Sequence, residues 1–281
     1  MKGSEGAFTV RRMTRAEVGL ALEWAAREGW NPGLHDAEPF FHTDPQGFFL
    51  GLLDDEPVGC ISAVAYDDAF GFIGFYIVRP EFRGRGFGLR IWNAAVSYLG
   101  DRTIGLDGVV ARQASYQKFG FQLAHRNVRY EGAGGGAVPT GIVDLAAVPF
   151  AQVEAYDAGL FPVPRPRFLR GWIAQPDSAA LGVIKDRELT GYGVLRPCRS
   201  GFKIGPLFAD SNAVAEDLFR ALAARAEGAL YLDTPEVNPA AIALAERHGM
   251  RPMFETARMY TKSAPALPHE RIFGITTFEL G

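Results

Sequence analysis

The sequence is poor in the features that mark several common classes of protein. Its 281 residues contain only two cysteines, Cys60 and Cys198, which excludes a disulfide framework and offers no metal-binding spacing. A formal net charge of −3 supplies no basic field, so broad nucleic-acid binding is not expected. No apolar run is long enough to cross a bilayer, and residues 1–6 lead into no apolar signal segment. We therefore expect a cytoplasmic protein without a metal that binds neither membranes nor nucleic acid, and the sequence leaves an oligomer open.

The most informative segment of the chain is a run of alternating glycines between a strand and a helix. An apolar strand is predicted over residues 72–78, and a helix-periodic stretch begins directly after the glycines. Glycines remove Cβ atoms, so consecutive backbone N–H groups can close on a bulky anion, and the helix N-terminus adds its positive dipole end. Arg83, just before the first glycine, and Arg85, between the first two, supply charges suited to phosphate. The pattern therefore predicts a pyrophosphate site, whereas one or two glycines would be enough for a turn without a ligand. Its central residues are Arg83, Gly84, Arg85, Gly86 and Gly88.

The spacing of these residues differs from that of a P-loop and from that of the dinucleotide-binding fingerprint. It resembles the coenzyme-A loop of the GNAT superfamily of N-acetyltransferases, whose pattern is Val-x-Pro-x-x-Arg/Gln-x-x-Gly-x-Gly/Ala. Val78, Pro80, Arg83, Gly86 and Gly88 fill every position of that pattern. The resemblance implies acetyl-CoA as co-substrate. The residues that it implies for binding are Tyr76, Ile77, Val78, Arg83, Gly84, Arg85, Gly86, Phe87, Gly88 and Leu89.

A second segment, Tyr116 to Phe121, resembles the superfamily's Tyr-x-x-x-Gly-Phe motif. Many members use this tyrosine as the general acid that reprotonates the departing CoA thiolate, so the resemblance implies that role for Tyr116. The alternative is a helix tyrosine packed into the core. The asparagine and alanine usual at the start of this helix correspond here to Val109 and Arg112, so the local capping must differ.

The acceptor amine must also lose a proton before it attacks. Asp107, at a predicted strand end just before the tyrosine helix, is the first candidate base, and Asp67 and Asp68 are alternatives. The alternative interpretation of Asp107 is a turn or cap residue, which an equivalent aspartate in the second half supports. Backbone N–H groups between Gly74 and Tyr76 could polarise the thioester carbonyl.

The sequence is predicted to contain two domains of the same kind. Residues 132–140, a glycine-rich stretch that breaks every periodicity, are predicted to link a catalytic domain over 1–131 to a degenerate GNAT-like domain over 141–281. We expect an α+β fold of two tandem GNAT-like domains, each a mixed, mostly antiparallel sheet flanked by helices. A tandem chain of this kind is similar to the YitH-like acetyltransferases.

The second copy lacks the anion-binding residues of the first. When Ile204-Gly-Pro206 is set against Val78-Arg-Pro80, residues 209–214 replace the glycine loop, and they contain no glycine and no arginine. Asp210 places a negative charge there. We therefore expect no CoA site in the second half. Residues 272–280 are predicted to be a strand that closes its sheet.

These observations predict an N-acetyltransferase that moves an acetyl group from acetyl-CoA to a primary amine, with a small molecule as acceptor. The alternatives are a protein-lysine acetyltransferase and a CoA-binding sensor or assembly module without turnover. The long loop over residues 29–47 contains His35, Asp36, His42 and Asp44, whose carboxylates would suit a cationic acceptor. Arg165 and its neighbours Arg167 and Arg170 either line a pocket or lie on the surface.

Overall fold

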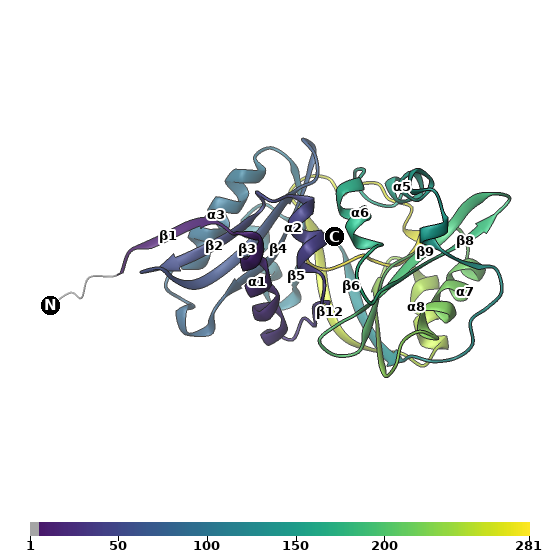
Figure 1. Cartoon of the computed structure of the whole chain (residues 1–281). Coiled ribbons are helices and arrows are strands. Elements are labelled where there is room, and N and C mark those ends of the chain that lie inside the picture. Colours follow the sequence, from purple (N-terminus) through teal and green to yellow (C-terminus); the bar gives the residue numbers. More distant parts are fainter. Residues whose placement is uncertain (1–5) are drawn as a thin grey trace.

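The structure, a computed structural model, describes residues 6–281 and contains two halves that share one continuous sheet (Figure 1). In these residues the strands follow the order β1-β2-β3-β4-β5-β12-β6-β11-β10-β9-β8-β7, and β13 pairs with β10. The strands are β1 (Phe8–Arg12), β2 (Phe48–Leu53), β3 (Glu56–Ala65), β4 (Phe70–Val78), β5 (Thr103–Val109), β6 (Gln122–Ala133), β7 (Ile142–Asp144), β8 (Ala179–Lys185), β9 (Glu188–Pro197), β10 (Phe202–Ala209), β11 (Ala229–Pro235), β12 (Arg251–Tyr260) and β13 (Ile272–Gly274). The helices are α1 (Arg15–Arg27), α2 (Ala37–Thr43), α3 (Phe87–Leu99), α4 (Gln113–Lys118), α5 (Phe150–Ala158), α6 (Pro166–Trp172), α7 (Asn212–Ala223) and α8 (Pro239–Arg247), with short 3-10 turns η1 (Pro80–Phe82), η2 (Val110–Arg112), η3 (Leu145–Ala147) and η4 (His269–Arg271).

Both halves follow the same plan. In the first, β1 to β4 form an antiparallel meander and β5 lies parallel to β4. In the second, β7 to β10 are antiparallel and β11 lies parallel to β10. Helices pack against the sheet in each half (Figure 1). The predicted architecture of two similar α+β units, each with a mixed and mostly antiparallel sheet, is confirmed.

The two halves exchange one strand each, which the sequence did not reveal. β6, the strand after α4, leaves the first half and pairs with β11. β12, the equivalent strand of the second half, pairs with β5 and also with β6. The two exchanged strands therefore form the seam of the molecule (Figure 1). β6 also runs to Ala133, two residues into the predicted linker.

Local sequence signals explain where the helices of the first half begin. α1 starts after Thr14, whose side chain and that of Glu17 form a capping box. α3 starts after Gly86, which has a φ of 82° and lies at the N-cap. Trp92 and Leu99 of α3 are buried against the sheet, as their spacing predicts. Leu89, three residues before Trp92 in the same helix, is half exposed.

The largest hydrophobic cluster lies between the halves. It joins α1 and α2 to α6 and to the end of the chain. Phe40 of α2 stacks on Trp172 of α6 with ring centroids 5.8 Å apart. Leu280 is buried in the same cluster, so the C-terminus lies between the two halves (Figure 1). Two smaller clusters lie under α3 and under α7 and α8. Burial of apolar surface between the halves therefore fixes their relative position.

The predicted strand over residues 272–280 is wrong beyond its first residues. Only Ile272 to Gly274 pair with β10, as β13. Residues 275–281 leave the second sheet and enter the first half, where the carbonyl of Leu280 accepts a hydrogen bond from the Tyr66 hydroxyl at 2.8 Å. We call residues 275–281 the C-terminal tail. The tail reaches the first half because tertiary contacts outweigh its strand-like pattern.

Among residues 6–281, none of the helices is both long and apolar enough to cross a membrane. The same residues contain no group of three or more histidine, cysteine, aspartate or glutamate side chains that could hold a metal ion.

Candidate functional site

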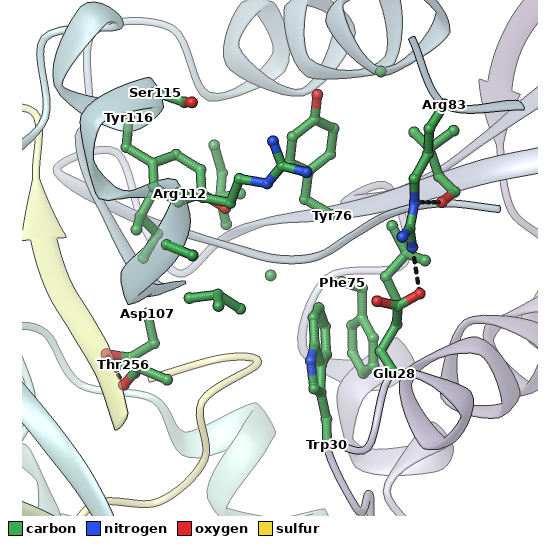
Figure 2. A pocket seen from close by; sticks show the side chains of 18 of the residues that line it. Glu28, Trp30, Phe75, Tyr76, Arg83, Asp107, Arg112, Ser115, Tyr116 and Thr256 are labelled. Atoms are coloured by element: carbon green, nitrogen blue, oxygen red, sulfur yellow. Dashed lines mark hydrogen bonds and ion pairs between the residues drawn. The ribbon is translucent and has the colours of Figure 1, made fainter. Parts of the chain in front are cut away.

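The principal cavity opens where two parallel strands separate. β4 and β5 are paired as far as Ile73 and Leu106 and then diverge. A cavity of about 480 Å³ lies along the gap, with side chains from both halves of the chain around it (Figure 2). The residues that line it are Glu28, Trp30, Ile73, Gly74, Phe75, Tyr76, Ile77, Val78, Phe82, Arg83, Gly84, Gly86, Phe87, Gly88, Leu89, Leu106, Asp107, Val109, Ala111, Arg112, Ser115, Tyr116, Phe119, Phe254, Thr256, Phe278 and Glu279.

β4 is irregular at the point where the strands separate. Ser62 of β3 pairs with Gly74 and Cys60 pairs with Ile77, so two residues of β4 lie opposite one residue of β3. Phe75 in this bulge has a φ of 48°, which is unusual for a residue other than glycine. A bulge frees backbone groups from the ladder. Gly74, Phe75 and Tyr76, whose backbone N–H groups are predicted to polarise a carbonyl, all line the cavity.

The glycine loop follows β4 and forms one end of the cavity. Gly84 and Gly86 both have positive φ, of 79° and 82°. A Cβ on Gly88 would lie 2.6 Å from the Tyr76 hydroxyl, so close packing requires glycine there. Within the described chain, no protein group accepts a hydrogen bond from the backbone N–H groups of residues 84–89. These N–H groups and the N-terminus of the 13-residue helix α3 form an anion-binding concavity.

The arginines of the loop have protein contacts of their own. Arg83 donates to the carbonyl of Val78 at 2.8 Å and forms an ion pair with Glu28 on one side of the cavity (Figure 2). The guanidinium of Arg85 lies 4.8 Å from the ring centroid of Phe87. The structure brings together every CoA-binding residue predicted from the sequence except Arg85, which does not line the cavity.

Tyr116 of α4 faces the cavity from the side of β5 (Figure 2). A Cβ on Gly108 would lie 2.4 Å from the tyrosine ring, so this glycine makes room for it. Burial, with a smaller contribution from Tyr76, raises the pKa of Tyr116 to about 12. The hydroxyl is therefore protonated at neutral pH, which is the form that a general acid requires.

Asp107 also lines the cavity, but its carboxylate is occupied by other side chains. It accepts two hydrogen bonds from Arg258 of β12, at 2.6 and 2.8 Å, and one from Asn127 of β6 at 2.8 Å. In the second half Asp233 accepts two from Arg129, at 2.6 and 2.8 Å. Each aspartate follows the last parallel pair of its half, and each arginine lies directly opposite on an exchanged strand.

The recurrence of this pair favours a structural interpretation of Asp107. The predicted equivalence of Asp107 and Asp233 is confirmed, since both follow the last paired residue of a parallel strand. An ion pair found also in the half without a glycine loop ties the exchanged strands to the sheets. That Asp107 acts as a base stays a prediction. The alternatives Asp67 and Asp68 lie in the turn before β4 and do not line the cavity.

Asp107→Asn and Asp233→Asn are both expected to lower the free energy of unfolding by about 3 kcal/mol, because each leaves a buried arginine without its charge partner. The measurement is chemical denaturation of each variant beside the unmodified chain. If Asp107→Asn left stability unchanged while Asp233→Asn reduced it, the structural interpretation of Asp107 would be incorrect.

Several cavity residues were not predicted from the sequence. Glu28 and Trp30 come from the segment after α1, and Phe254 and Thr256 come from the exchanged strand β12. Phe278 and Glu279 belong to the C-terminal tail. The strand exchange and the path of the tail bring these residues to the cavity, and no local pattern in the sequence marks either.

The polar residues expected to receive the acceptor lie elsewhere. Asp36 is buried beside Arg196, with a hydrogen bond of 3.0 Å. Asp44 accepts a hydrogen bond from the Tyr98 hydroxyl at 2.8 Å. The remaining side chains of this group have partners too: His35 contacts Asp177, His42 contacts Glu38, and Arg165 forms a buried ion pair with Asp157. None of these predicted residues lines the cavity.

The loop of the second half that corresponds to the glycine loop is short, and its side chains already bind other protein groups. Ile204-Gly-Pro206 aligns with Ile73-Gly-Phe75, not with Val78-Arg-Pro80, because Ile204 is the last residue paired with β11. Only Asp210 and Ser211 separate β10 from α7, whereas residues 79–86 separate β4 from α3. Ser211 accepts a hydrogen bond from the N–H of Val214, and Asp210 pairs with Arg271 at 2.6 Å. The absence of a CoA site in this half stays a prediction, and these contacts support it.

Comparison with known proteins finds one family match in each half of the chain. Residues 17–121 match the model of the Acetyltransferase (GNAT) family, and residues 153–274 match that of an Acetyltransferase (GNAT) domain. The holothin acyltransferase of Pseudoalteromonas sp. (strain SANK 73390) is 33% identical over 98% of this chain and 95% of its own length. The uncharacterized N-acetyltransferase YitH of Bacillus subtilis (strain 168) is 27% identical over 68% of this chain and 70% of its own length. A crystal structure from Pyrococcus horikoshii has a TM-score of 0.85 at 24% identity, covering 100% of this chain and 98% of that one, and shares its fold.

Proposed function

Because the chain belongs to the GNAT acyltransferase family, we propose that it is an N-acetyltransferase that moves the acetyl group of acetyl-CoA to a primary amine of a small molecule. The observation that carries this proposal is the cavity where β4 and β5 separate. Free backbone N–H groups lie at one end of it, and a protonated tyrosine lies along its side. One cavity thus offers a place for a pyrophosphate and a place for a reacting thioester.

Acetyl-CoA fits this arrangement through charge and through backbone geometry. The N–H groups of residues 84–89 would receive the pyrophosphate at the N-terminus of α3. The strand from Tyr76 to Val78 would pair with the amides of pantetheine, as in the resemblance drawn above. The bulge at Phe75 would then face the thioester carbonyl.

The proposed reaction is direct attack of the amine in a ternary complex. The amine nitrogen bonds to the thioester carbon, and the bond from that carbon to sulfur breaks. Tyr116 gives its proton to the leaving thiolate. The amine must first be deprotonated, and Asp107 was the candidate for this step from the sequence alone.

The walls of the cavity favour a small acceptor over a protein. Trp30 of the first half and Phe254 and Phe278 of the second half line it, so aromatic side chains from both halves border the space for the acceptor. A lysine on a protein surface would need an open groove. The name of one relative, holothin acyltransferase, also supports acyl transfer by this chain.

We further propose that the enzyme is cytoplasmic, since Cys60 and Cys198 are both free and buried, and that it acts without metal or nucleic acid.

Calorimetric titration with acetyl-CoA is expected to show one site per chain. In the first half the N–H groups of the anion-binding concavity have no protein acceptor, whereas in the second half the side chain of Ser211 caps the corresponding helix N-terminus. A stoichiometry of two would mean that the second half also binds the nucleotide. No binding would remove the proposed reaction and leave an acyltransferase with another donor.

A further inference from the structure

The C-terminal tail is held in place by contacts from several distant parts of the chain. All of its residues are buried. The backbone N–H of Ile275 donates to the carbonyl of Asp233 at 2.8 Å, and the Thr276 hydroxyl accepts a hydrogen bond from Arg165 at 2.9 Å. The hydroxyl of Tyr66 fixes the far end through the carbonyl of Leu280. The tail is thus an ordered part of the cavity wall and lies outside both ranges that match the family models.

The tail meets β4 at the position where the reaction is proposed to occur. A Cβ on Gly74 would lie 2.0 Å from the backbone oxygen of Glu279, so the two backbones are in close contact. Gly74 is the first residue of β4 after its last pair with β5, and Phe75 in the bulge follows it. Glu279 therefore lines the cavity beside the predicted position of the thioester.

The carboxyl group of Glu279 has no protein partner in the described chain. The residue is 3% exposed, and its Oε1 is fully buried without a hydrogen bond. A buried polar group in this state costs free energy unless something else binds it. The carboxyl is thus a buried, unpaired acceptor in the wall of the cavity.

Three cationic side chains lie around Glu279, and none of them donates a hydrogen bond to it. Lys203 of β10 donates to the carbonyl of Asn31 at 3.0 Å. Arg129 of β6 is held by Asp233 of β11. Arg196 of β9 donates from Nε to Asp36 before α2, whereas its Nη1 and Nη2 have no hydrogen-bond partner in the described residues. Burial raises the pKa of Glu279; Lys203, Arg129 and Arg196 oppose this shift, and Asp36 adds to it.

We propose that Glu279 is the catalytic base that binds the ammonium group of the acceptor and takes its proton, which makes the acceptor an aliphatic amine that is cationic in solution. This inference rests on the proposed function. The ammonium gives one proton to the Glu279 carboxylate, and the free amine attacks the thioester carbon. As the bond from carbon to sulfur breaks, Tyr116 gives its proton to the thiolate and is restored by the second proton of the nitrogen, and Glu279 then releases its proton to solvent. The products are the amide, CoA thiol and one proton released to solvent, so the protons balance.

Glu279 suits this step better than Asp107 does. Asp107 is held by a bidentate arginine and an asparagine, and an equivalent aspartate is held in the same way in the second half. The carboxyl of Glu279 has no such partner and can receive a cation.

The test is Glu279→Gln in the full chain, with Glu270→Gln as the matched control. Glu270 is exposed, lies in η4 close to the tail and does not line the cavity. CoA release is followed with a thiol reagent, using benzylamine, aniline or water as acceptor. We expect Glu279→Gln to reduce release with benzylamine at least roughly 100-fold at neutral pH. The loss should be much smaller with aniline, which is uncharged at that pH.

The pH profile, the affinity for acetyl-CoA and the melting temperature together distinguish loss of a base from loss of binding or of the fold. In the unmodified chain, activity should fall as pH drops through the raised pKa of Glu279, and this limb should be absent in Glu279→Gln. The variant should bind acetyl-CoA within about 2-fold of the unmodified chain, and its melting temperature should not fall, because it removes an unpaired buried charge. Release within 3-fold of the control would overturn the inference and leave the proposed function standing. Failure of the unmodified chain to bind acetyl-CoA would overturn both.

Discussion

Gly86→Asp is expected to lower the affinity for acetyl-CoA at least roughly 100-fold while the fold is retained. Gly86 lies at the N-cap of α3, and a Cβ added there meets no atom within 4 Å. An aspartate at an N-cap accepts the N–H groups of the first helical turn, which are the donors proposed for the pyrophosphate. It also repels phosphate, since two like charges 4 Å apart interact by about 4 kcal/mol at an effective dielectric constant of about 20. Calorimetric titration measures the loss.

Gly86→Ala is the control that separates charge from backbone strain. It carries the same unfavourable positive φ, which costs about 1 kcal/mol, but adds no charge. Ser211→Asp places the same carboxylate at the N-cap of α7 and should leave affinity unchanged. If Gly86→Asp bound acetyl-CoA within 5-fold of Gly86→Ala, the pyrophosphate could not lie at this helix N-terminus.

The glycine loop could be predicted from the sequence because its signals are local. Positive φ at Gly84 and Gly86 and the start of α3 are properties of a few consecutive residues. The same holds for Tyr116, where a short helix ends at Gly120 before the next strand. The residues that these signals indicate do line one cavity, with the exception of Arg85.

The strand exchange and the tail depend on distant contacts, so the sequence did not reveal them. β6 and β12 pair with strands of the opposite half, and there Arg129 and Arg258 each form an ion pair with an aspartate of the other half. The tail continues the strand-like pattern of β13, but its path is decided by Arg165 and Tyr66. Glu279 reaches the cavity only through that path.

Tyr116→Phe is expected to lower the single-turnover rate of acetyl transfer roughly 100- to 1,000-fold, the usual effect of losing a general acid. The change should alter neither acetyl-CoA affinity by more than about 3-fold nor the fold, since the tyrosine hydroxyl has no hydrogen-bond partner among residues 6–281. The ring would keep its packing against Gly108 and its contact with Trp92, whose ring centroid lies 5.7 Å away. Rapid mixing with acetyl-CoA and an amine measures the rate.

Tyr76→Phe decides which tyrosine acts as the acid. Tyr76 lines the same cavity, and burial raises its pKa as well, so both hydroxyls are protonated at neutral pH. Its hydroxyl packs against Gly88 of the glycine loop, which favours a part in binding. Loss of rate in Tyr116→Phe alone assigns the acid to α4, and loss in Tyr76→Phe alone would assign it to β4.

With a pKa of about 12, Tyr116 keeps its proton up to that pH, so its ionisation causes no fall in rate on the basic side of the pH profile below pH 12. Any fall in rate between pH 8 and 10 must therefore come from another group.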